Sequence, residues 1–159
     1  MSVSFDYIGR ISTPFKGVEG MPIQTAGAEG AVGKATIEAA YAGGLKDLEG
    51  FSHIILIYHL DRIEGYSLEV LPFLDDRKHG IFATRSPKRP NPIGISVVRL
   101  LSVAGNVVSF AGPDMLDGTP LLDIKPYVAR FDRFSPEREG WFEGKAENAA
   151  TTKSDGRFK

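Results

Sequence analysis

The segment 51–60, FSHIILIYHL, is the most hydrophobic run of the chain. A run this short cannot cross a bilayer as a helix, and its composition predicts a buried central strand. Under the two-residue period of a strand, Ile54, Leu56 and Tyr58 share one face, while His53 and His59 lie on the other. We expect His53 to be hydrogen-bonded within the core. His59 stands at the strand end, where it can face a ligand.

Shorter strand-like segments lie on either side of this run. They occupy 5–12, 34–41, 93–101 and 107–110. Ala104-Gly105-Asn106 predicts a hairpin turn between the last two, and 45–49 predicts a short helical turn. No GxGxxG follows a strand, and strands do not alternate with helices, which excludes the doubly wound nucleotide-binding fold. The pattern therefore predicts a mainly β fold.

The segment 15–33 is rich in glycine and has no hydrophobic periodicity. It predicts a long loop in the N-terminal half, with Pro22, Ile23 and Gln24 in its middle. Loops of this length inside compact domains are often functional.

Length and composition indicate one domain. A chain of 159 residues with 42% hydrophobic content can bury one core, and its net charge of −1 gives no overall attraction to nucleic acid. No segment resembles a membrane span or signal peptide, and there is no cysteine for disulfides or thiolate metal sites. Two histidines on one strand face lack a third ligand with suitable spacing, so we expect no metal. We expect a soluble, cytoplasmic protein without membrane contact.

The signature segment, 80–101, reads GIFATRSPKRPNPIGISVVRLL. Each proline fixes its own φ and pushes the preceding residue towards extended geometry, so Ser86, Arg89 and Asn91 are held largely pre-set. A loop already in its bound shape loses less entropy when a ligand binds. Together with Arg85, these side chains predict a binding loop. The flanking stretch 77–89 is basic and has no acidic residue, which favours either a phosphate-contacting role or a solvated face.

The sequence resembles the TrmO, or TsaA-like, family on the stretch ATRSPKRPNPIG. Three further stretches agree with that family in the expected order. They are IGRISTPF at 8–15, LEGFSHI at 48–54 and LDGTPLLDIKPY at 116–127. The resemblance runs from about Tyr7 to Tyr127.

The resemblance implies a small closed β-barrel that binds S-adenosylmethionine (SAM), here at 1–142. The run 143–159 is small, polar and charged, so we expect it to be a disordered tail. It implies methylation of N6 of N6-threonylcarbamoyladenosine beside the anticodon of tRNA, with a homodimer whose cofactor pocket lies near the subunit interface. The extra C-terminal domain of many bacterial members is not found in this sequence, although short members also occur.

SAM binding needs groups for the ribose hydroxyls, the adenine edge and the methionine carboxylate. Asp117 with the exposed backbone at Gly118 and Thr119 suits the first two, and Arg85 or Arg89 suits the third. The resemblance implies a cofactor lid in the loop 15–33. The full set of expected cofactor contacts is Pro22, Ile23, Gln24, His59, Leu60, Arg85, Ser86, Arg89, Asn91, Asp117, Gly118, Thr119 and Pro120.

The accepting nitrogen is weakly nucleophilic, so transfer needs a base or strong orientation. Asp123, Lys125 and Tyr127 are the catalytic candidates, as a carboxylate base or a tyrosine beside an ammonium group. Asp123 and Lys125 share a strand face and can equally be paired with each other. Two other functions remain open: methylation of a small molecule, and a non-catalytic SAM- or RNA-binding module.

Overall fold

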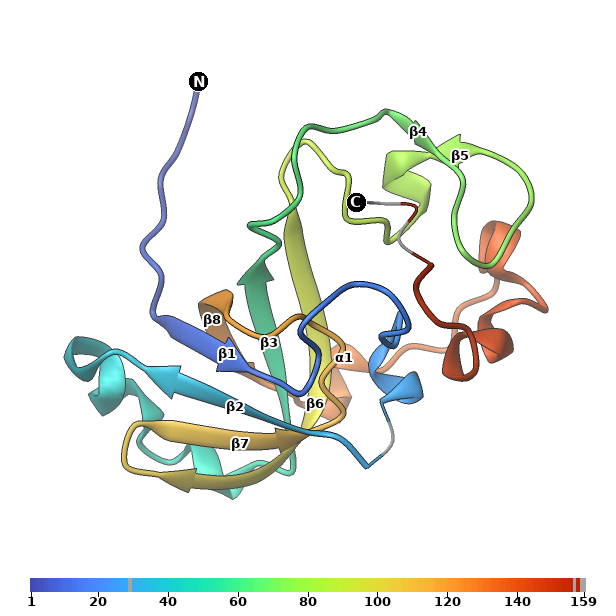
Figure 1. Ribbon diagram of the computed structural model, residues 1–159. Helices are drawn as coiled ribbons and strands as arrows, with labels where there is room; N and C mark the ends of the chain where they lie inside the picture. The colour runs from blue at the N-terminus through green and yellow to red at the C-terminus, as the bar shows by residue number, and fades with distance from the viewer. Residues whose placement is uncertain (29, 156, 158–159) are drawn as a thin grey trace.

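The computed structural model describes residues 1–28, 30–155 and 157. Over these residues the main sheet closes into a barrel with the strand order β1-β2-β7-β6-β3-β8 (Figure 1). All its pairings are antiparallel. The strands are β1 (Gly9–Ser12), β2 (Val32–Ile37), β3 (His53–His59), β6 (Ile93–Ala104), β7 (Val107–Ala111) and β8 (Thr119–Pro126). The closed β-barrel expected from the sequence is confirmed.

Alternate residues of each strand fill the barrel. In β3, Ile54, Leu56 and Tyr58 are buried, as the two-residue period predicts. They pack with Val98 of β6 and Phe110 of β7 in one hydrophobic cluster. Burial of this inner face is the main favourable contribution to the fold.

Glycine permits a close approach at one point of this core. Gly94 pairs with Tyr58 across β6 and β3, and a Cβ atom built on Gly94 would lie 2.1 Å from the tyrosine ring. The ring therefore lies over the bare backbone of Gly94. This arrangement directs the Tyr58 hydroxyl towards Ser96, 2.9 Å away.

Several predicted bounds differ from the structure. The first strand begins at Gly9 rather than at residue 5, and the second ends at Ile37. A 3₁₀ helix, Ala39–Leu45, follows β2 and takes residues predicted to be strand. A second one, Leu48–Gly50, overlaps the predicted helical turn. The hairpin at Gly105 is confirmed, with the glycine at φ 61° between β6 and β7.

The core position predicted for His53 is wrong. The side chain is half-buried on the outer face of β3, where a ring nitrogen lies 2.9 Å from Ser52 Oγ. Its ring also meets the ring of Tyr127 edge-on, with 6.2 Å between centroids. The histidine has a hydrogen-bond partner as expected, but on the other side of the strand.

A smaller layer lies above the barrel opening. It contains the two-stranded sheet of β4 (Glu69–Val70) and β5 (His79–Gly80), the 3₁₀ helix Ile81–Ala83 and the rest of the signature loop (Figure 1). The helix α1 (Ala129–Asp132) follows β8. No helix among the described residues is long and apolar enough to cross a membrane.

The segment 140–157, without Gly156, packs on this layer and on the long loop. Its short helices are Gly140–Phe142 and Ala146–Ala150. Ser154 exchanges backbone hydrogen bonds with the loop, donating to Met21 O at 3.0 Å and accepting from Gly20 N at 2.7 Å. The domain boundary after 142 and the disorder of 143–159 stay predictions. Gly156, Phe158 and Lys159 of that tail, and Glu29 of the long loop, lie outside the described residues.

Candidate functional site

The signature loop is held together by Arg89. Its Nη1 lies within hydrogen-bond distance of the carbonyl oxygens of Ile81 (3.1 Å), Thr84 (2.8 Å) and Ser86 (3.4 Å). Three carbonyl oxygens of the loop thus point towards one guanidinium cation. In the structure, Arg89 shapes the loop. Its predicted contact with a ligand carboxylate stays a prediction.

Ser86 is the unusual residue of this loop. Its side chain is buried, and its Oγ has no hydrogen-bond partner among the described residues. A buried hydroxyl without a partner costs free energy, so such a group commonly marks a place where a ligand or water completes the bonding. Asn91, near the end of the loop, is exposed, and its carbonyl accepts a 2.8 Å bond from Ile93 N.

Arg85 connects the signature loop to the long N-terminal loop. Its Nη1 donates to Gln24 Oε1 at 3.2 Å, although 61 residues separate them. Pro22 is buried and Ile23 is half-buried beside Gln24. The structure therefore brings two groups of predicted cofactor contacts together.

The end of β3 forms another wall of the site. The backbone of Leu60 donates to Pro92 O at 2.8 Å, which ties the strand end to the signature loop. His59 Nδ1 lies 2.6 Å from the Tyr7 hydroxyl, and the two rings stack with centroids 5.9 Å apart. The N-terminal segment thus orients the imidazole of His59.

Asp117 lies at the centre of a polar cluster between β1 and β8. Its Oδ1 accepts a 3.0 Å bond from Thr13 N, and its Oδ2 pairs with Lys16 Nζ. The Lys16 bond is the main cause that lowers the pKa of Asp117, so the carboxylate is ionised at neutral pH. Arg62 donates to the Asp117 carbonyl at 2.6 Å, which brings a second cation to this turn.

The rest of this turn is mainly structural. Gly118 has φ 82°, and its carbonyl accepts from Arg10 Nη1 at 3.1 Å. Thr119 is buried and its hydroxyl donates to Leu116 O at 2.7 Å, while Pro120 is fully buried. Of the four predicted contacts here, Asp117 offers the most accessible polar group.

A surface pocket of about 460 Å³ opens beside Asp117. Its lining residues are Ser12, Thr13, Lys16, Val32, Lys34 and Asp117. A second pocket, of about 420 Å³, is lined by Ser67, Glu69, Val70, Leu71, Lys88 and Arg157. Both are open and shallow in character, and each contains two cationic side chains.

A buried polar chain that sequence reasoning missed lies between the barrel and the long loop. Ser96 Oγ lies 2.9 Å from the Tyr58 hydroxyl and donates to Asp114 Oδ1 at 2.6 Å. The backbone of Thr25 also bonds to this carboxylate. Burial raises the pKa of Asp114 to about 6, and it also raises the pKa of Tyr58. Asp114 stands out in the sequence only as one of several acidic residues in a polar cluster.

The catalytic candidates are spread along β8. Asp123 pairs in register with Ile57, and Tyr127 N bonds to His53 O at the opposite end of β3 from His59. At about 3.3 Å per residue, Tyr127 lies about 20 Å along the strand from His59. Lys125 Nζ lies 2.8 Å from Asp123 Oδ2, so the ion pair considered from the sequence is present. These three side chains are not gathered at the signature loop of the same chain.

The comparisons with known proteins decide the family. The model of the tRNA-methyltransferase O N-terminal domain matches residues 10–133. This chain belongs to that family. A probable S-adenosyl-L-methionine-binding protein of Pyrococcus abyssi is 48% identical over 158 residues, which cover 99% of this chain and 86% of that protein.

Two further relatives are longer proteins. The tRNA (adenine(37)-N6)-methyltransferase of Mus musculus is 47% identical over 91 residues, covering 55% of this chain and 21% of the mouse protein. The crystal structure of TrmO from Pseudomonas aeruginosa superposes with a TM-score of 0.74 at 34% identity, covering 89% of this chain and 63% of that one. This chain therefore spans less than two thirds of the solved TrmO protein and about a fifth of the mouse enzyme.

The family's cofactor fits the residues present. Ser86 Oγ is a buried polar atom that lacks a partner among the described residues, and the carbonyl of the same residue is 3.4 Å from Arg89 Nη1. Arg85 can pair with a carboxylate, and Asp117 can accept from ribose hydroxyls with its remaining lone pairs. No group of three potential metal ligands occurs in the ranges 1–28 and 30–155 or at 157.

Proposed function

We propose that this protein is a SAM-dependent methyltransferase that methylates N6 of N6-threonylcarbamoyladenosine at position 37 of tRNA. The orphaned Oγ of Ser86, inside a loop that the Arg89 guanidinium holds in shape, carries the proposal. The names of the archaeal and mouse relatives support the cofactor and the acceptor, respectively.

The chain's own residues mainly position the two reactants. Bound SAM supplies a methyl group activated by its sulfonium. Arg85 binds the methionine carboxylate, Ser86 completes its hydrogen bonding on a ligand polar group, and Asp117 accepts from the ribose. Such positioning lowers the entropic part of the barrier.

The N6 proton must leave as the new bond to carbon forms. Of the three candidates, Asp123 lies nearest to His59, the last residue of β3. Its partner across the sheet, Ile57, is two residues before His59. Asp123 Oδ2 lies 2.8 Å from Lys125 Nζ, and a carboxylate is one of the side-chain groups that serve as a general base. Tyr127 is the second candidate for the base. Its ring meets the ring of His53 instead of the cation that was expected beside it.

The proposed assembly is a homodimer through the outer face of β3 and β6. Ile93, Ile95 and Val97 are exposed on β6, and Ile95 is 59% exposed. They pair across the sheet with His59, Ile57 and Ile55, respectively. An exposed apolar sheet face of this kind is typical of a protein interface. Ile95→Glu should give a monomer by sedimentation velocity, and an unchanged dimer would place the interface elsewhere.

The domain division and the compartment complete the proposal. Residues 1–142 form the SAM-binding barrel domain, and the protein acts in the cytoplasm on mature tRNA. The cysteine-free sequence is compatible with that reducing compartment.

The decisive experiment combines calorimetric titration of SAM with a methylation assay. Wild-type protein should bind SAM with micromolar affinity and transfer label from SAM to tRNA that carries the threonylcarbamoyl group, with the modified nucleoside identified by mass spectrometry. Ser86→Ala should weaken SAM binding, whereas Ser102→Ala, an exposed serine of β6, should not. A wild-type protein that binds no SAM, with and without tRNA, would refute the proposal.

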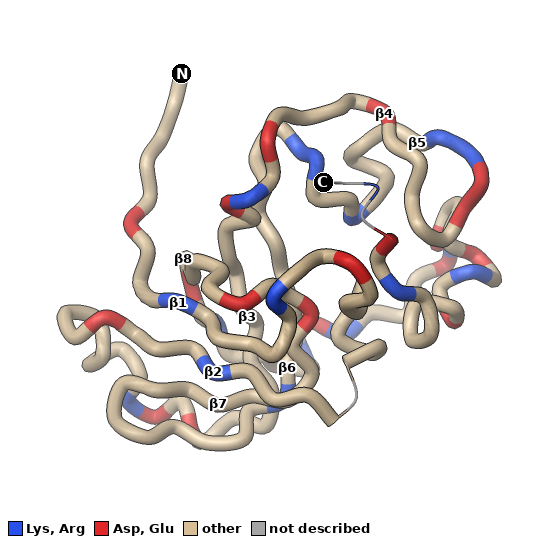
Figure 2. Tube along the Cα trace, in the orientation of Figure 1, with Lys and Arg blue, Asp and Glu red and all other residues tan. Residues whose placement is uncertain are grey.

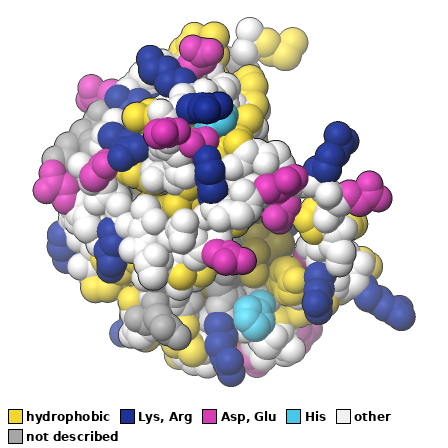
Figure 3. Space-filling view, turned by 90° about the vertical axis from the view of Figure 1, so that its right-hand side faces the viewer, with side chains coloured by type: hydrophobic (Ala, Val, Ile, Leu, Met, Phe, Trp, Pro, Cys, Tyr) yellow, Lys and Arg dark blue, Asp and Glu magenta, His cyan; other side chains and the backbone are white. Residues whose placement is uncertain are grey.

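A small-molecule acceptor is the second candidate, favoured by the charge distribution. The net charge is −1, and acidic and basic side chains are interspersed on the face shown in Figure 3. If this candidate is right, tRNA binding should be weak and independent of salt. A tRNA enzyme instead loses RNA affinity steeply as salt rises.

A further inference from the structure

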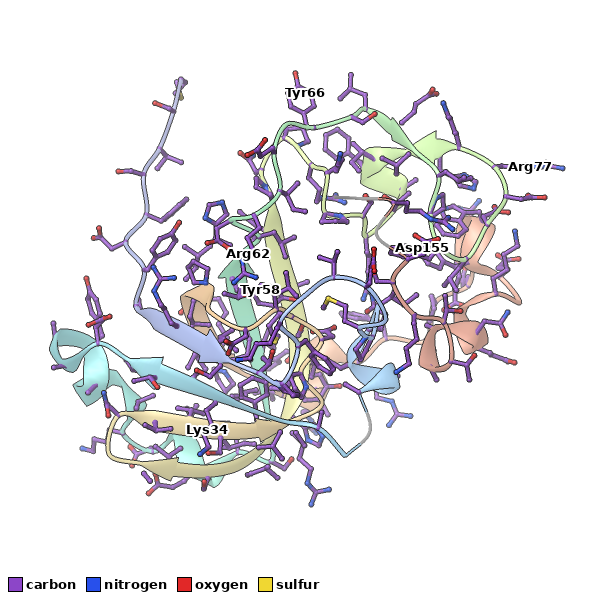
Figure 4. All side chains as sticks on the ribbon, viewed as in Figure 1. Lys34, Tyr58, Arg62, Tyr66, Arg77 and Asp155 are labelled. Carbon is purple, nitrogen blue, oxygen red and sulfur yellow. The ribbon has the colours of Figure 1, made fainter. Side chains whose placement is uncertain are left out.

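Two exposed aromatic side chains lie beside the signature loop. Tyr66 is 62% exposed and projects from the upper edge of the molecule (Figure 4). Phe82 is 78% exposed in the short helix Ile81–Ala83. An exposed aromatic ring beside a candidate binding loop can stack on a planar group of a bound molecule.

The backbone under Phe82 is fixed although its ring is free. Ile81 N donates to Leu68 O at 2.9 Å, and Thr84 N donates to Ile81 O at 3.1 Å. Trp141 donates to the Ala83 carbonyl at 2.7 Å. The ring is therefore presented to solvent by a rigid turn.

Arg89 connects this ring to the candidate site. Its guanidinium carbon lies 5.9 Å from the centroid of Phe82, while Nη1 of the same group holds the carbonyls of Thr84 and Ser86. Phe82 thus borders the loop that contains the orphaned hydroxyl. A flat ring at this place can stack on a planar group that is adjacent to the reacting one.

Tyr66 lies in the connection before β4, next to the same loop. The following residue, Ser67, donates its backbone N–H to Lys88 O at 3.2 Å. The pocket of about 420 Å³ opens here, with Ser67 and Lys88 in its lining. Glu69 and Arg157 also line this pocket, and Tyr66 directly precedes its lining residue Ser67.

The charged residues around the signature loop indicate which class of molecule would bind there. Residues 77–91 contain Arg77, Lys78, Arg85, Lys88 and Arg89 and no acidic residue. The basic positions fall in the loop after β4 and in the signature loop (Figure 2). Asp75, which precedes the stretch, is already engaged by Lys145 at 2.7 Å and by His79 at 2.8 Å. Exposed rings beside this run of basic residues match single-stranded nucleic acid, whose bases stack and whose phosphates attract cations.

We propose that Phe82 and Tyr66 form a stacking platform for unpaired bases of the RNA substrate, next to the base that is methylated, while Lys88 contacts a phosphate. The inference deepens the proposed function and rests on it. It locates the RNA on the signature-loop layer.

Fluorescence anisotropy with a labelled anticodon stem-loop RNA tests the platform. Phe82→Ala and Tyr66→Ala should each raise the RNA Kd about 10-fold, the size expected for loss of one base–aromatic stack. Phe82→Trp should restore binding. Tyr41→Ala removes an exposed tyrosine from the 3₁₀ helix Ala39–Leu45, at the other end of the barrel, and should bind RNA as the wild type does.

Two further measurements separate stacking from other roles. The Kd for SAM should stay unchanged in both alanine variants, and Lys88→Ala should lower the slope of log Kd against log salt by about 1. Wild-type RNA affinity in both aromatic variants would overturn the platform even if the wild-type protein methylates tRNA. Dissociation of a dimer in these variants would also overturn it, because the rings would then belong to a subunit interface. RNA binding that depends on both rings, without any methyl transfer, would support the platform and refute the proposed activity.

Discussion

The indole nitrogen of Trp141 donates a 2.7 Å hydrogen bond to the carbonyl oxygen of Ala83, in the first part of the signature loop. The same indole stacks on His79 and Phe142, with centroid distances of 4.6 and 3.8 Å. The match to the family model ends at residue 133, so this contact reaches the loop from outside the shared domain. Trp141 is therefore a positioning residue for the loop.

Trp141→Phe should weaken SAM binding while the fold is retained. Phenylalanine can keep the stacking but cannot donate to Ala83. A lost hydrogen bond of about 1 kcal/mol corresponds to about a fivefold rise in the Kd for SAM. Calorimetry measures this change, with Phe134→Ala, a highly exposed phenylalanine, as the control. Equal affinities for the variant and the wild type would show that the bond does not shape the site.

Arg89→Ala should abolish SAM binding without unfolding the barrel. Three carbonyls lose their common cation, and hydrogen bonds to a charged group contribute about 1.5–3 kcal/mol. Arg89→Lys should recover part of the affinity because an ammonium can still bind carbonyls. SAM titration and a circular dichroism melt distinguish loop disruption from global unfolding. Full SAM affinity in Arg89→Ala would contradict both the predicted and the observed role.

Asp114→Asn should remove a pH dependence of stability between about pH 4 and 6. The folded-state pKa of Asp114 is raised from 3.8 to about 6, so the folded protein binds this proton more tightly than the unfolded chain does. The contribution of Asp114 to stability is therefore greatest below pH 4 and falls as the pH rises to 6. At about 1.4 kcal/mol per unit, the difference amounts to about 3 kcal/mol.

Urea unfolding of the two proteins across this pH range tests the sign. The free energy of unfolding of the wild type should fall relative to that of Asp114→Asn as the pH rises from 4 to 6, and then stay parallel to it. Parallel curves over the whole range would mean that the carboxylate of Asp114 titrates normally.

Gly94→Ala should destabilise the barrel. The new Cβ atom would lie 2.1 Å from the Tyr58 ring, and overpacking of this kind costs about 1–3 kcal/mol. Gly43→Ala is the matched control, because no atom lies within 4 Å of its added Cβ. Thermal melting gives the comparison. Equal melting temperatures would show that the tyrosine ring moves aside freely.

The fold could be predicted from the sequence where local pattern and packing agree. The alternation of β3 and the Gly105 hairpin follow from periodicity and turn chemistry, and the structure has both. The strand ends could not be predicted as well. Residues 5–8 look like strand, but β1 pairs with β2 and β8 only from Gly9 onwards.

The site could be predicted in part, because its loops can be recognised in the sequence from their proline, glycine and charged residues. The bridge from Arg85 to Gln24 joins two segments that the sequence suggested separately. The buried hydrogen bond of Asp114 and the bond from Trp141 to Ala83 could not be predicted, since each depends on a contact with a distant segment. His53 shows the same limit of prediction from sequence. The two-residue period of a strand assigns each residue to a face, but it does not say which face points into the core.

The pairing of Ser154 with Gly20 and Met21 has a practical consequence for handling the protein. Arg157 also donates to Pro72 O at 2.9 Å, so the last described residue lies against the segment before β5. Shortening the chain before Ser154 would therefore remove both contacts, and with them a support of the loop that carries Gln24. Residues 1–6 are exposed, but Tyr7 directly after them bonds to His59, so a purification tag at the N-terminus should be joined through a spacer.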